Sequence, residues 1–275
     1  MISSKLNKQA LGALMIAALS TLSVQTQAAI ETRSDDPLFK PQWDVTLGLG
    51  AMSVAMPWKG IDRQTAALPY FDLSYGNWQF SAEQLVKYQY PLPVGENISV
   101  FAGLNYRDDS YDAKGTLFSE TSDDPVFADY ERLDGEVLFN AGVQWNDLSF
   151  SIAQDVSDNT SATSAHLAWE LPLYTSSFGL MVNASAKVNW YSEDYVNYYY
   201  GIAGDQIKNS VGRVAYQADA ATNVELGLNV VYPINQSWAV VGFLSRTRLD
   251  DSITDSPLID SQYSDTVALM LTHRM

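Results

Sequence analysis

The chain has 275 residues and no cysteine, is 47% hydrophobic, and carries 32 acidic against 16 basic side chains, a net charge of −16. This acidic balance argues against nucleic-acid binding, which needs basic surface to neutralise phosphates. Beyond the N-terminus no run of about 18 apolar residues occurs, which excludes a helical membrane protein.

Residues 1–29 are predicted to be a secretory signal peptide that is cleaved. Lys5 and Lys8 form a basic segment, an apolar stretch follows, and small residues lead up to Ala29. Removing this segment leaves 14 basic against 32 acidic side chains, a net charge of −18. An exported chain without cysteine has no disulfides, so its stability must come from a large sheet or core.

Residues 30–42 contain two prolines and are predicted to be an irregular periplasmic lead-in. From residue 43 to residue 275, alternation of apolar and polar side chains predicts a single all-β domain. Successive side chains of a strand point to opposite faces, so this period of two is typical of strands with one apolar face. The predicted strands cover residues 43–56, 67–75, 78–83, 86–90, 98–107, 137–145, 148–152, 165–171, 178–190, 224–232, 238–246 and 264–275.

The stretch from Phe178 to Trp190 is the longest clean example of the alternation. Its apolar face begins and ends on an aromatic residue, and its polar face carries Lys187. Twelve steps span about 40 Å along a strand. Tilted by about 40° in a closed barrel, that length becomes roughly 30 Å of height, close to the apolar band of an outer-membrane barrel.

These features together predict a transmembrane antiparallel up-and-down β-barrel of about 12 strands. Residues 78–97 are ambiguous and leave the strand count between 10 and 12. Short and long connections alternate, which places both termini on the short-turn side, and short turns face the periplasm in bacterial outer-membrane barrels. The predicted location is therefore the outer membrane of a Gram-negative cell.

Charged and aromatic residues are sorted in the way that a barrel in lipid requires. A lipid-facing Lys or Arg at mid-depth costs roughly 2–4 kcal/mol, so charges within strands should face the lumen. The charges predicted to face inward are Asp44, Asp72, Glu83, Lys87, Arg107, Glu136, Glu170, Lys187 and Glu225. An outward aromatic belt at the periplasmic ends is predicted from Trp43, Trp78, Trp145, Phe178, Tyr232 and Trp238.

Little in the sequence points to chemistry. The two histidines, His166 and His273, are predicted on opposite faces of the wall, so a His/Cys metal site is not expected. A hydrolase would need a nucleophile beside a base, and Ser149 and Ser151 near His166 are ordinary polar lumen residues. We therefore predict no enzyme activity, no cofactor, and no catalytic, cofactor-binding or metal-ligating residues.

Three features leave alternatives open. The lumen charges either line a narrow pore or pair with one another and close it. Residues 108–134 hold nine acidic side chains, which either collect divalent cations or form a solvated loop. The tyrosines between 191 and 200 form an adhesive surface, an outer aromatic girdle, or a loop folded over the mouth.

Several short stretches resemble the MipA/OmpV family of outer-membrane proteins. They are Leu68-Pro69-Tyr70-Phe71-Asp72 with Tyr75-Gly76, Gly103-Leu104-Asn105-Tyr106-Arg107, Tyr199-Tyr200-Gly201-Ile202, and Asp255-Ser256-Pro257-Leu258. The resemblance extends over nearly the whole predicted mature chain. Members of the family usually end on an aromatic residue, whereas this chain ends on His273-Arg274-Met275.

The resemblance implies a non-enzymatic scaffold among the lipids and lipopolysaccharide of the outer membrane. The family's name-giving member resembles an adaptor that links a lytic transglycosylase to a peptidoglycan synthase on the periplasmic side. The residues alone also allow a narrow channel for small solutes or cations, or a surface adhesin or stress-related protein.

Overall fold

The computed structural model describes residues 42–61, 63–82, 84–94, 97–111 and 121–275. The predicted signal peptide and residues 30–41 of the lead-in lie outside the described residues, as does Glu83. The domain boundaries drawn there stay predictions.

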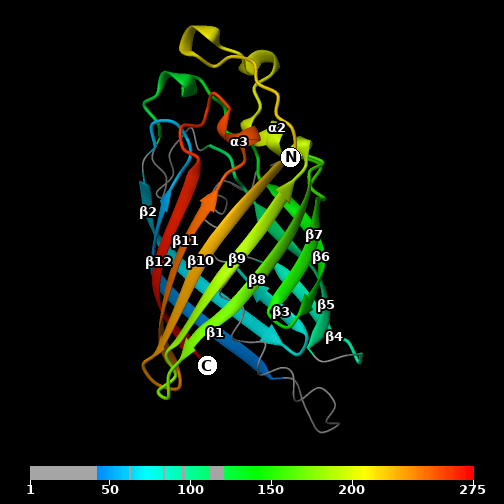
Figure 1. The fold of residues 1–275 in the computed structure, drawn as a ribbon, viewed down its shortest axis with the longest axis vertical. Coiled ribbons are helices and arrows are strands. Elements are labelled where there is room, and N and C mark those ends of the chain that lie inside the picture. The colour runs from blue at the N-terminus through cyan, green and yellow to red at the C-terminus, as the bar shows by residue number, and fades with distance from the viewer. Residues whose placement is uncertain (1–41, 62, 83, 95–96, 112–120) are drawn as a thin grey trace, which may run out of the picture.

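The described residues form a closed antiparallel barrel of twelve strands, in which each strand pairs with its neighbour in the chain and β1 closes on β12. Figure 1 shows the barrel from the side, with the C-terminus at its lower end. The strands are β1 (Trp43–Ala55), β2 (Arg63–Tyr75), β3 (Trp78–Ser81), β4 (Val86–Pro91), β5 (Ile98–Arg107), β6 (Glu136–Trp145), β7 (Leu148–Asp155), β8 (Thr163–Thr175), β9 (Met181–Tyr191), β10 (Ala221–Pro233), β11 (Trp238–Arg248) and β12 (Tyr263–Arg274).

The all-β up-and-down fold with twelve strands is confirmed, and the differences lie at strand ends. β8 continues to Thr175 through a bulge between Pro172 and Tyr174, where a turn was expected. β9 begins at Met181, so the predicted strand start at Phe178 is wrong by three residues. The chain turns at Gly179 with a φ of +91°, a conformation that glycine adopts without strain.

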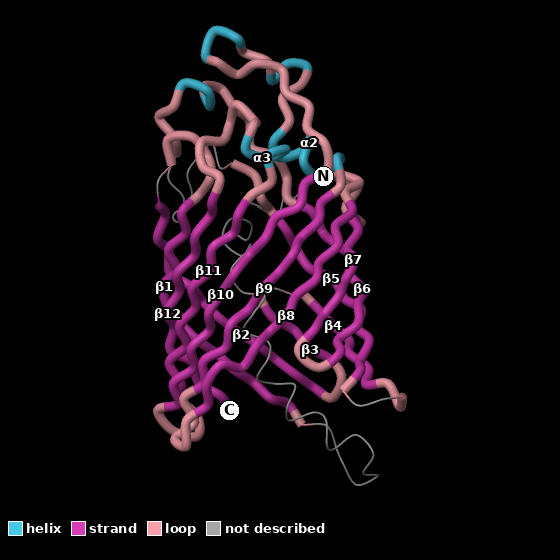
Figure 2. Tube along the Cα trace, in the orientation of Figure 1, coloured by secondary structure: helices cyan, strands magenta, loops and turns pink. Residues whose placement is uncertain are grey.

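The two ends of the barrel differ in their connections. The turn end carries the short turns, the start of β1 and Met275. The loop end carries the long loops, as Figure 2 shows; its described residues include α2 (Glu193–Tyr200), α3 (Asp251–Thr254) and three short 3-10 helices. None of the described helices is long and apolar enough to cross a membrane. The 3-10 helices are Pro125–Phe127, Gly204–Gln206 and Asn209–Val211.

The wall sorts its side chains largely as predicted. Six of the predicted inward charges are buried: Asp72, Lys87, Arg107, Glu136, Lys187 and Glu225. The six predicted belt aromatics are all exposed: Trp43, Trp78, Trp145, Phe178, Tyr232 and Trp238. The sorting is not complete, however, because Arg63, Arg246 and Arg248 lie on the outward face within strands.

Two buried apolar clusters fill the interior. The lumen cluster lies inside the wall and is built from β1, β2, β10, β11 and β12; its buried members are Met52, Leu68, Val231, Val241, Phe243, Ala268 and Met270. A larger cluster, which we call the cap, lies at the loop end. Its buried members are Trp58, Ile61, Tyr111, Val126, Phe127, Tyr130, Ala162, Tyr195, Val196, Tyr199, Tyr200, Ile202, Ala218, Ala221, Leu249, Ile253, Leu258 and Ile259.

Candidate functional site

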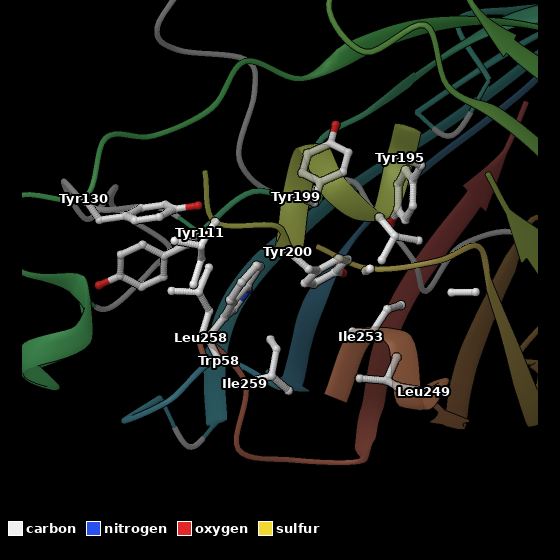
Figure 3. Packing of buried hydrophobic residues seen from close by; sticks show 14 of the residues in the cluster. Trp58, Tyr111, Tyr130, Tyr195, Tyr199, Tyr200, Leu249, Ile253, Leu258 and Ile259 are labelled. Atoms are coloured by element: carbon white, nitrogen blue, oxygen red, sulfur yellow. The ribbon is translucent and has the colours of Figure 1, made fainter. Parts of the chain in front are cut away.

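The cap joins loops that are far apart in the sequence into one aromatic core. Trp58, from the β1–β2 connection, stacks on Tyr200 of α2 with ring centroids 5.3 Å apart. Tyr111 stacks on Phe127 at 3.8 Å within the loop between β5 and β6. Figure 3 shows Trp58, Tyr111 and Tyr200 together with Ile253 and Leu258 from the β11–β12 loop. Side chains of this kind would otherwise be exposed to water at the loop end, so their burial stabilises the closed arrangement.

Helix α2 supplies the centre of the cap because its tyrosines share one face. Tyr195, Val196, Tyr199 and Tyr200 are all buried, and their spacing of one and four residues brings them to the same side of a helix. Glu193 and Asp194 stand in its first turn, where acidic groups complement the helix dipole. Of the three alternatives for the tyrosine-rich segment, burial of these side chains favours a loop folded over the mouth.

Below the aromatic rings, Arg107 at the end of β5 holds the cap to the wall. Its guanidinium lies 2.8 Å from a carboxylate oxygen of Glu136 and donates to the Ser164 hydroxyl at 3.3 Å. The same guanidinium stands 4.4 Å from the ring centroid of Tyr195, a cation–π distance. One arginine thus connects β5, β6, β8 and α2.

Glu136 is completely buried and has partners from three segments. Besides the ion pair with Arg107, it accepts hydrogen bonds from the Tyr199 hydroxyl at 3.2 Å and the Thr160 hydroxyl at 2.6 Å. A buried charge is tolerated only when it is paired and hydrogen-bonded, and Glu136 meets both conditions. This carboxylate is therefore a structural anchor of the cap.

Asp109 lies in the loop directly above Arg107. It accepts a hydrogen bond from the Tyr195 hydroxyl at 2.6 Å and lies 4.0 Å from the Arg107 guanidinium. Burial raises the pKa of Asp109 to about 6, with Arg107 and the Tyr195 hydrogen bond acting in the opposite direction. Burial also raises the pKa of Tyr195 well above its usual value, so its hydroxyl stays a donor.

Two further lumen charges form a pair. Lys187 on β9 lies 3.2 Å from Glu225 on β10, and the Thr247 hydroxyl donates to Glu225 at 3.3 Å. Of the two arrangements that the sequence left open, these contacts favour paired charges over a charged pore lining. Fixed pairs of opposite sign also leave little net field to attract ions of one sign.

The predicted histidine placements show no catalytic or metal geometry. The ring nitrogens of His166 lie 2.9 Å from Asn189 Oδ1 and 3.1 Å from Ser164 Oγ, and no described hydrogen bond joins the ring to Ser149 or Ser151. His273 packs against Trp238 with ring centroids 4.5 Å apart. Within the described ranges no group of three or more His, Cys, Asp or Glu side chains is placed to hold a metal.

Three described carboxylates of the acidic loop bind neighbouring protein groups. Asp108 pairs with Arg132, Asp124 accepts from the backbone N–H of Val126 at 2.9 Å, and Asp129 pairs with Lys208 at 2.7 Å. Asp112 and Glu120, the remaining acids near its middle, lie outside the described residues. The contacts seen here are those of a packed loop rather than of a cation site.

The turn end exposes apolar side chains where two hairpins project side by side. A Cβ on Gly179 in the β8–β9 turn would stand 2.9 Å from Pro233 at the end of β10, so the two hairpins touch. We call the exposed apolar residues here the turn patch: Leu173 (53% exposed), Tyr174 (55%), Phe178 (62%) and Ile234 (53%). The turn patch was not predicted from the sequence, although consecutive Leu173 and Tyr174 break the strict alternation.

A closed antiparallel barrel with an apolar outward face and an aromatic belt defines the class of outer-membrane β-barrels, because closure leaves no strand edge in lipid. Residues 47–275 match the family described as "MltA-interacting protein MipA". The chain belongs to this family and is an outer-membrane protein.

Relatives cover different shares of the chain. The "MltA-interacting protein" of Escherichia coli (strain K12) is 31% identical over 131 residues, which span 48% of this chain and 52% of that protein. The chain thus matches only about half the length of that relative. The "Putative outer membrane protein YiaT" of the same strain is 25% identical over 81% of this chain and 87% of the relative. "Outer membrane protein OmpV" of Vibrio cholerae is 37% identical over 28% of this chain and 29% of the relative.

Among solved structures, a loop-deletion mutant of OmpT from Vibrio cholerae matches 86% of this chain and 100% of that chain, with a TM-score of 0.34 and 9% identity.

Proposed function

We propose that the protein is a non-enzymatic outer-membrane scaffold whose turn end faces the periplasm and binds a peptidoglycan-remodelling enzyme. The turn patch is the observation that carries this proposal. Its four apolar side chains are about half exposed or more and lie on adjoining hairpins at the end that bears the short turns. Short turns face the periplasm in bacterial outer-membrane barrels, which supports this orientation.

The chemistry of the patch suits a protein partner. Aromatic and large aliphatic anchors dominate protein interfaces, and each such side chain contributes about 1.5–3 kcal/mol when fully buried. Leu173, Tyr174 and Phe178 come from one projecting hairpin, and all three side chains are exposed. The printed name of the Escherichia coli relative, "MltA-interacting protein", supports a partner of the lytic transglycosylase class. An adaptor for two enzymes also needs a second surface, for a peptidoglycan synthase.

The packed loop end supports a role as a scaffold rather than as a channel. The cap packs aromatic rings over the mouth, and the charges nearest to it are held in pairs. Neither feature supplies the nucleophile, base or metal that an enzyme of the outer membrane would need.

The proposal is tested by pull-down of periplasmic lytic transglycosylases with the purified protein. The triple variant Leu173→Ser, Tyr174→Ser and Ile234→Ser removes three anchors without adding charge. We expect it to lose at least about tenfold in affinity, since each 1.4 kcal/mol of lost binding free energy is a factor of ten.

The matched control is Val94→Ser in the β4–β5 turn, which is also exposed at the turn end but away from both hairpins. It should bind like the unaltered protein. Equal retention by the triple variant and the unaltered protein would count against the turn patch. No enrichment of transglycosylase over an unrelated barrel would count against the scaffold role itself.

A further inference from the structure

The outward arginines of the barrel gather on one side of its loop end. Arg63 stands at the start of β2, and Arg246 and Arg248 stand at the end of β11. On the outward face of the described strands there is no other Lys or Arg. Lys87, Arg107 and Lys187 are turned into the lumen and buried. This placement is unexpected in a chain with a net charge of −16.

Strand pairing brings these arginines together, although β2 and β11 are far apart in the sequence. In the strand register, Arg63 on β2 lies opposite Ala55 on β1, and Ala55 lies opposite Asp265 on β12. Asp265 in turn lies opposite Arg246 on β11. Arg248 pairs with Tyr263 in the neighbouring register position. We call Arg63, Arg246 and Arg248 the arginine patch. Asp265 is the acidic group among them, so the patch keeps an excess of two positive charges.

Their contacts leave hydrogen-bond donors available. Arg246 makes a two-point contact with Asp265 at 2.7 and 2.8 Å and lies 5.2 Å from the ring centroid of Tyr263, which fixes its orientation. Arg63 reaches Ser53 only at 3.4–3.5 Å. The side chain of Arg248 is exposed and forms no hydrogen bond or ion pair with any of the described residues.

The patch stands at the height where the apolar band ends. From the belt residue Trp238 to Arg248 is ten steps along β11, about 33 Å, or about 25 Å of height at a tilt of about 40°. That matches the roughly 25 Å band of outer-membrane barrels. Directly toward the turn end, Leu244, Val267 and Leu269 face outward and are exposed. Cationic groups therefore lie just above an apolar surface.

We propose that the arginine patch binds the phosphorylated glycolipid of the outer leaflet, lipopolysaccharide, through the phosphates of its lipid anchor. Guanidinium groups bind phosphate oxygens by two-point hydrogen bonds, and arginine is suited to this task more than lysine. The acyl chains of the same lipid lie along Leu244, Val267 and Leu269. The assignment rests on the orientation in the proposed function, with the loop end outward.

The experiment measures binding of bis-phosphorylated lipid A to the full protein in detergent micelles by native mass spectrometry. The double variant Arg63→Gln and Arg248→Gln should bind at least about tenfold more weakly, because it loses the charge-assisted hydrogen bonds of two guanidinium groups to phosphate. The matched control, Lys59→Gln and Lys208→Gln, removes the same charge from the loops and should bind like the unaltered protein. Equal binding by the two double variants would overturn the site.

The charge-conserving variant Arg63→Lys and Arg248→Lys keeps both positive charges but cannot form the two-point hydrogen bonds of a guanidinium group. We therefore expect an affinity for lipid A between those of the unaltered protein and the glutamine variant. Since it preserves surface charge, it keeps the test valid even if the glutamine variant folds poorly. Binding as tight as that of the unaltered protein would contradict recognition by arginine.

Three other ligands identify the source of the phosphate. Lipid A without phosphates and phosphatidylglycerol should both bind more weakly than bis-phosphorylated lipid A, and inorganic phosphate should not displace it. Equal binding of either lipid, or displacement by inorganic phosphate, would overturn the assignment to lipopolysaccharide. The pull-down varies different residues at the other end of the barrel, so failure of one proposal is distinguishable from failure of the other.

Discussion

The two ends of the barrel use the same aromatic residues in opposite ways. At the loop end, Trp58 is 4% exposed and packs among tyrosines, whereas Trp145 at the turn end is 55% exposed. One ion pair from each end shows the same contrast, although Lys208–Asp129 at the loop end is exposed. The Arg107–Glu136 pair is buried, and the Arg274–Asp44 pair lies at the rim of the turn end.

The difference follows from what each end meets. Loops that leave the bilayer enter water, where aromatic side chains gain by packing on one another. Aromatic residues at the turn end meet the lipid interface, where amphipathic rings are stable without protein neighbours. The loop end is therefore a small water-facing core on top of a barrel, and the turn end keeps its apolar groups available for lipid or a partner.

The largest expected effect is at the buried ion pair. Glu136→Ala leaves Arg107 buried without its carboxylate, which should cost about 3–5 kcal/mol in the free energy of unfolding. The equivalent change at the turn end, Asp44→Ala, should cost less than about 1 kcal/mol, because its pair with Arg274 is partly exposed. Urea unfolding in detergent micelles, followed by tryptophan fluorescence, measures both. Similar losses would contradict the division between the two ends.

A smaller effect is expected in the apolar part of the cap. Ile253 is fully buried there, and Ile253→Ala should cost about 2–5 kcal/mol through lost packing and a residual cavity. Ile152 on β7 is outward and exposed, so Ile152→Ala should cost far less. Hydrogen exchange of the β11–β12 loop reports the loss at the cap. Unchanged protection in Ile253→Ala would show that the cap is not packed in solution.

The smallest effect is a pH dependence at Asp109. Because burial raises its pKa to about 6, the folded cap prefers the protonated carboxyl. The stabilisation is fully present below about pH 4, the ordinary value for aspartate, and is lost as the pH rises through about 6. Proteolysis of residues 192–220 should therefore slow between pH 7 and pH 4.

Asp109→Asn should remove this dependence, because the amide does not titrate and can still accept from the Tyr195 hydroxyl. A pH profile in Asp109→Asn identical to that of the unaltered chain would assign the effect to another group.

Local alternation was enough to predict the barrel, and the reason is physical. The face that each side chain occupies follows from residues two apart, as from Val182 to Trp190 in β9, and sequential strands pair in order. The strands β3 and β4 were harder to predict, because both are short and the alternation of apolar and polar residues is interrupted between Ser81 and Val86.

The cap could not be predicted in the same way because it depends on contacts between distant loops. Trp58 meets Tyr200, and Glu136 meets Arg107 and Tyr199, only after the barrel has closed. The helical spacing of Tyr195, Val196, Tyr199 and Tyr200 was a usable signal. The outward position of Arg246 in the arginine patch could also have been predicted, because Arg246 is an even number of residues from the outward Trp238 and Leu244 on the same strand.

Planar-bilayer recording tests the central claim most directly, namely that the barrel is closed at the loop end and works through the turn end. The comparison variant replaces residues 192–220 by Asn-Gly, which joins Tyr191 to Ala221 through a hairpin turn and removes α2 from the mouth. We predict no discrete conductance steps from the unaltered protein and steps from the variant. Regular steps from the unaltered protein would contradict the account and indicate an open pore.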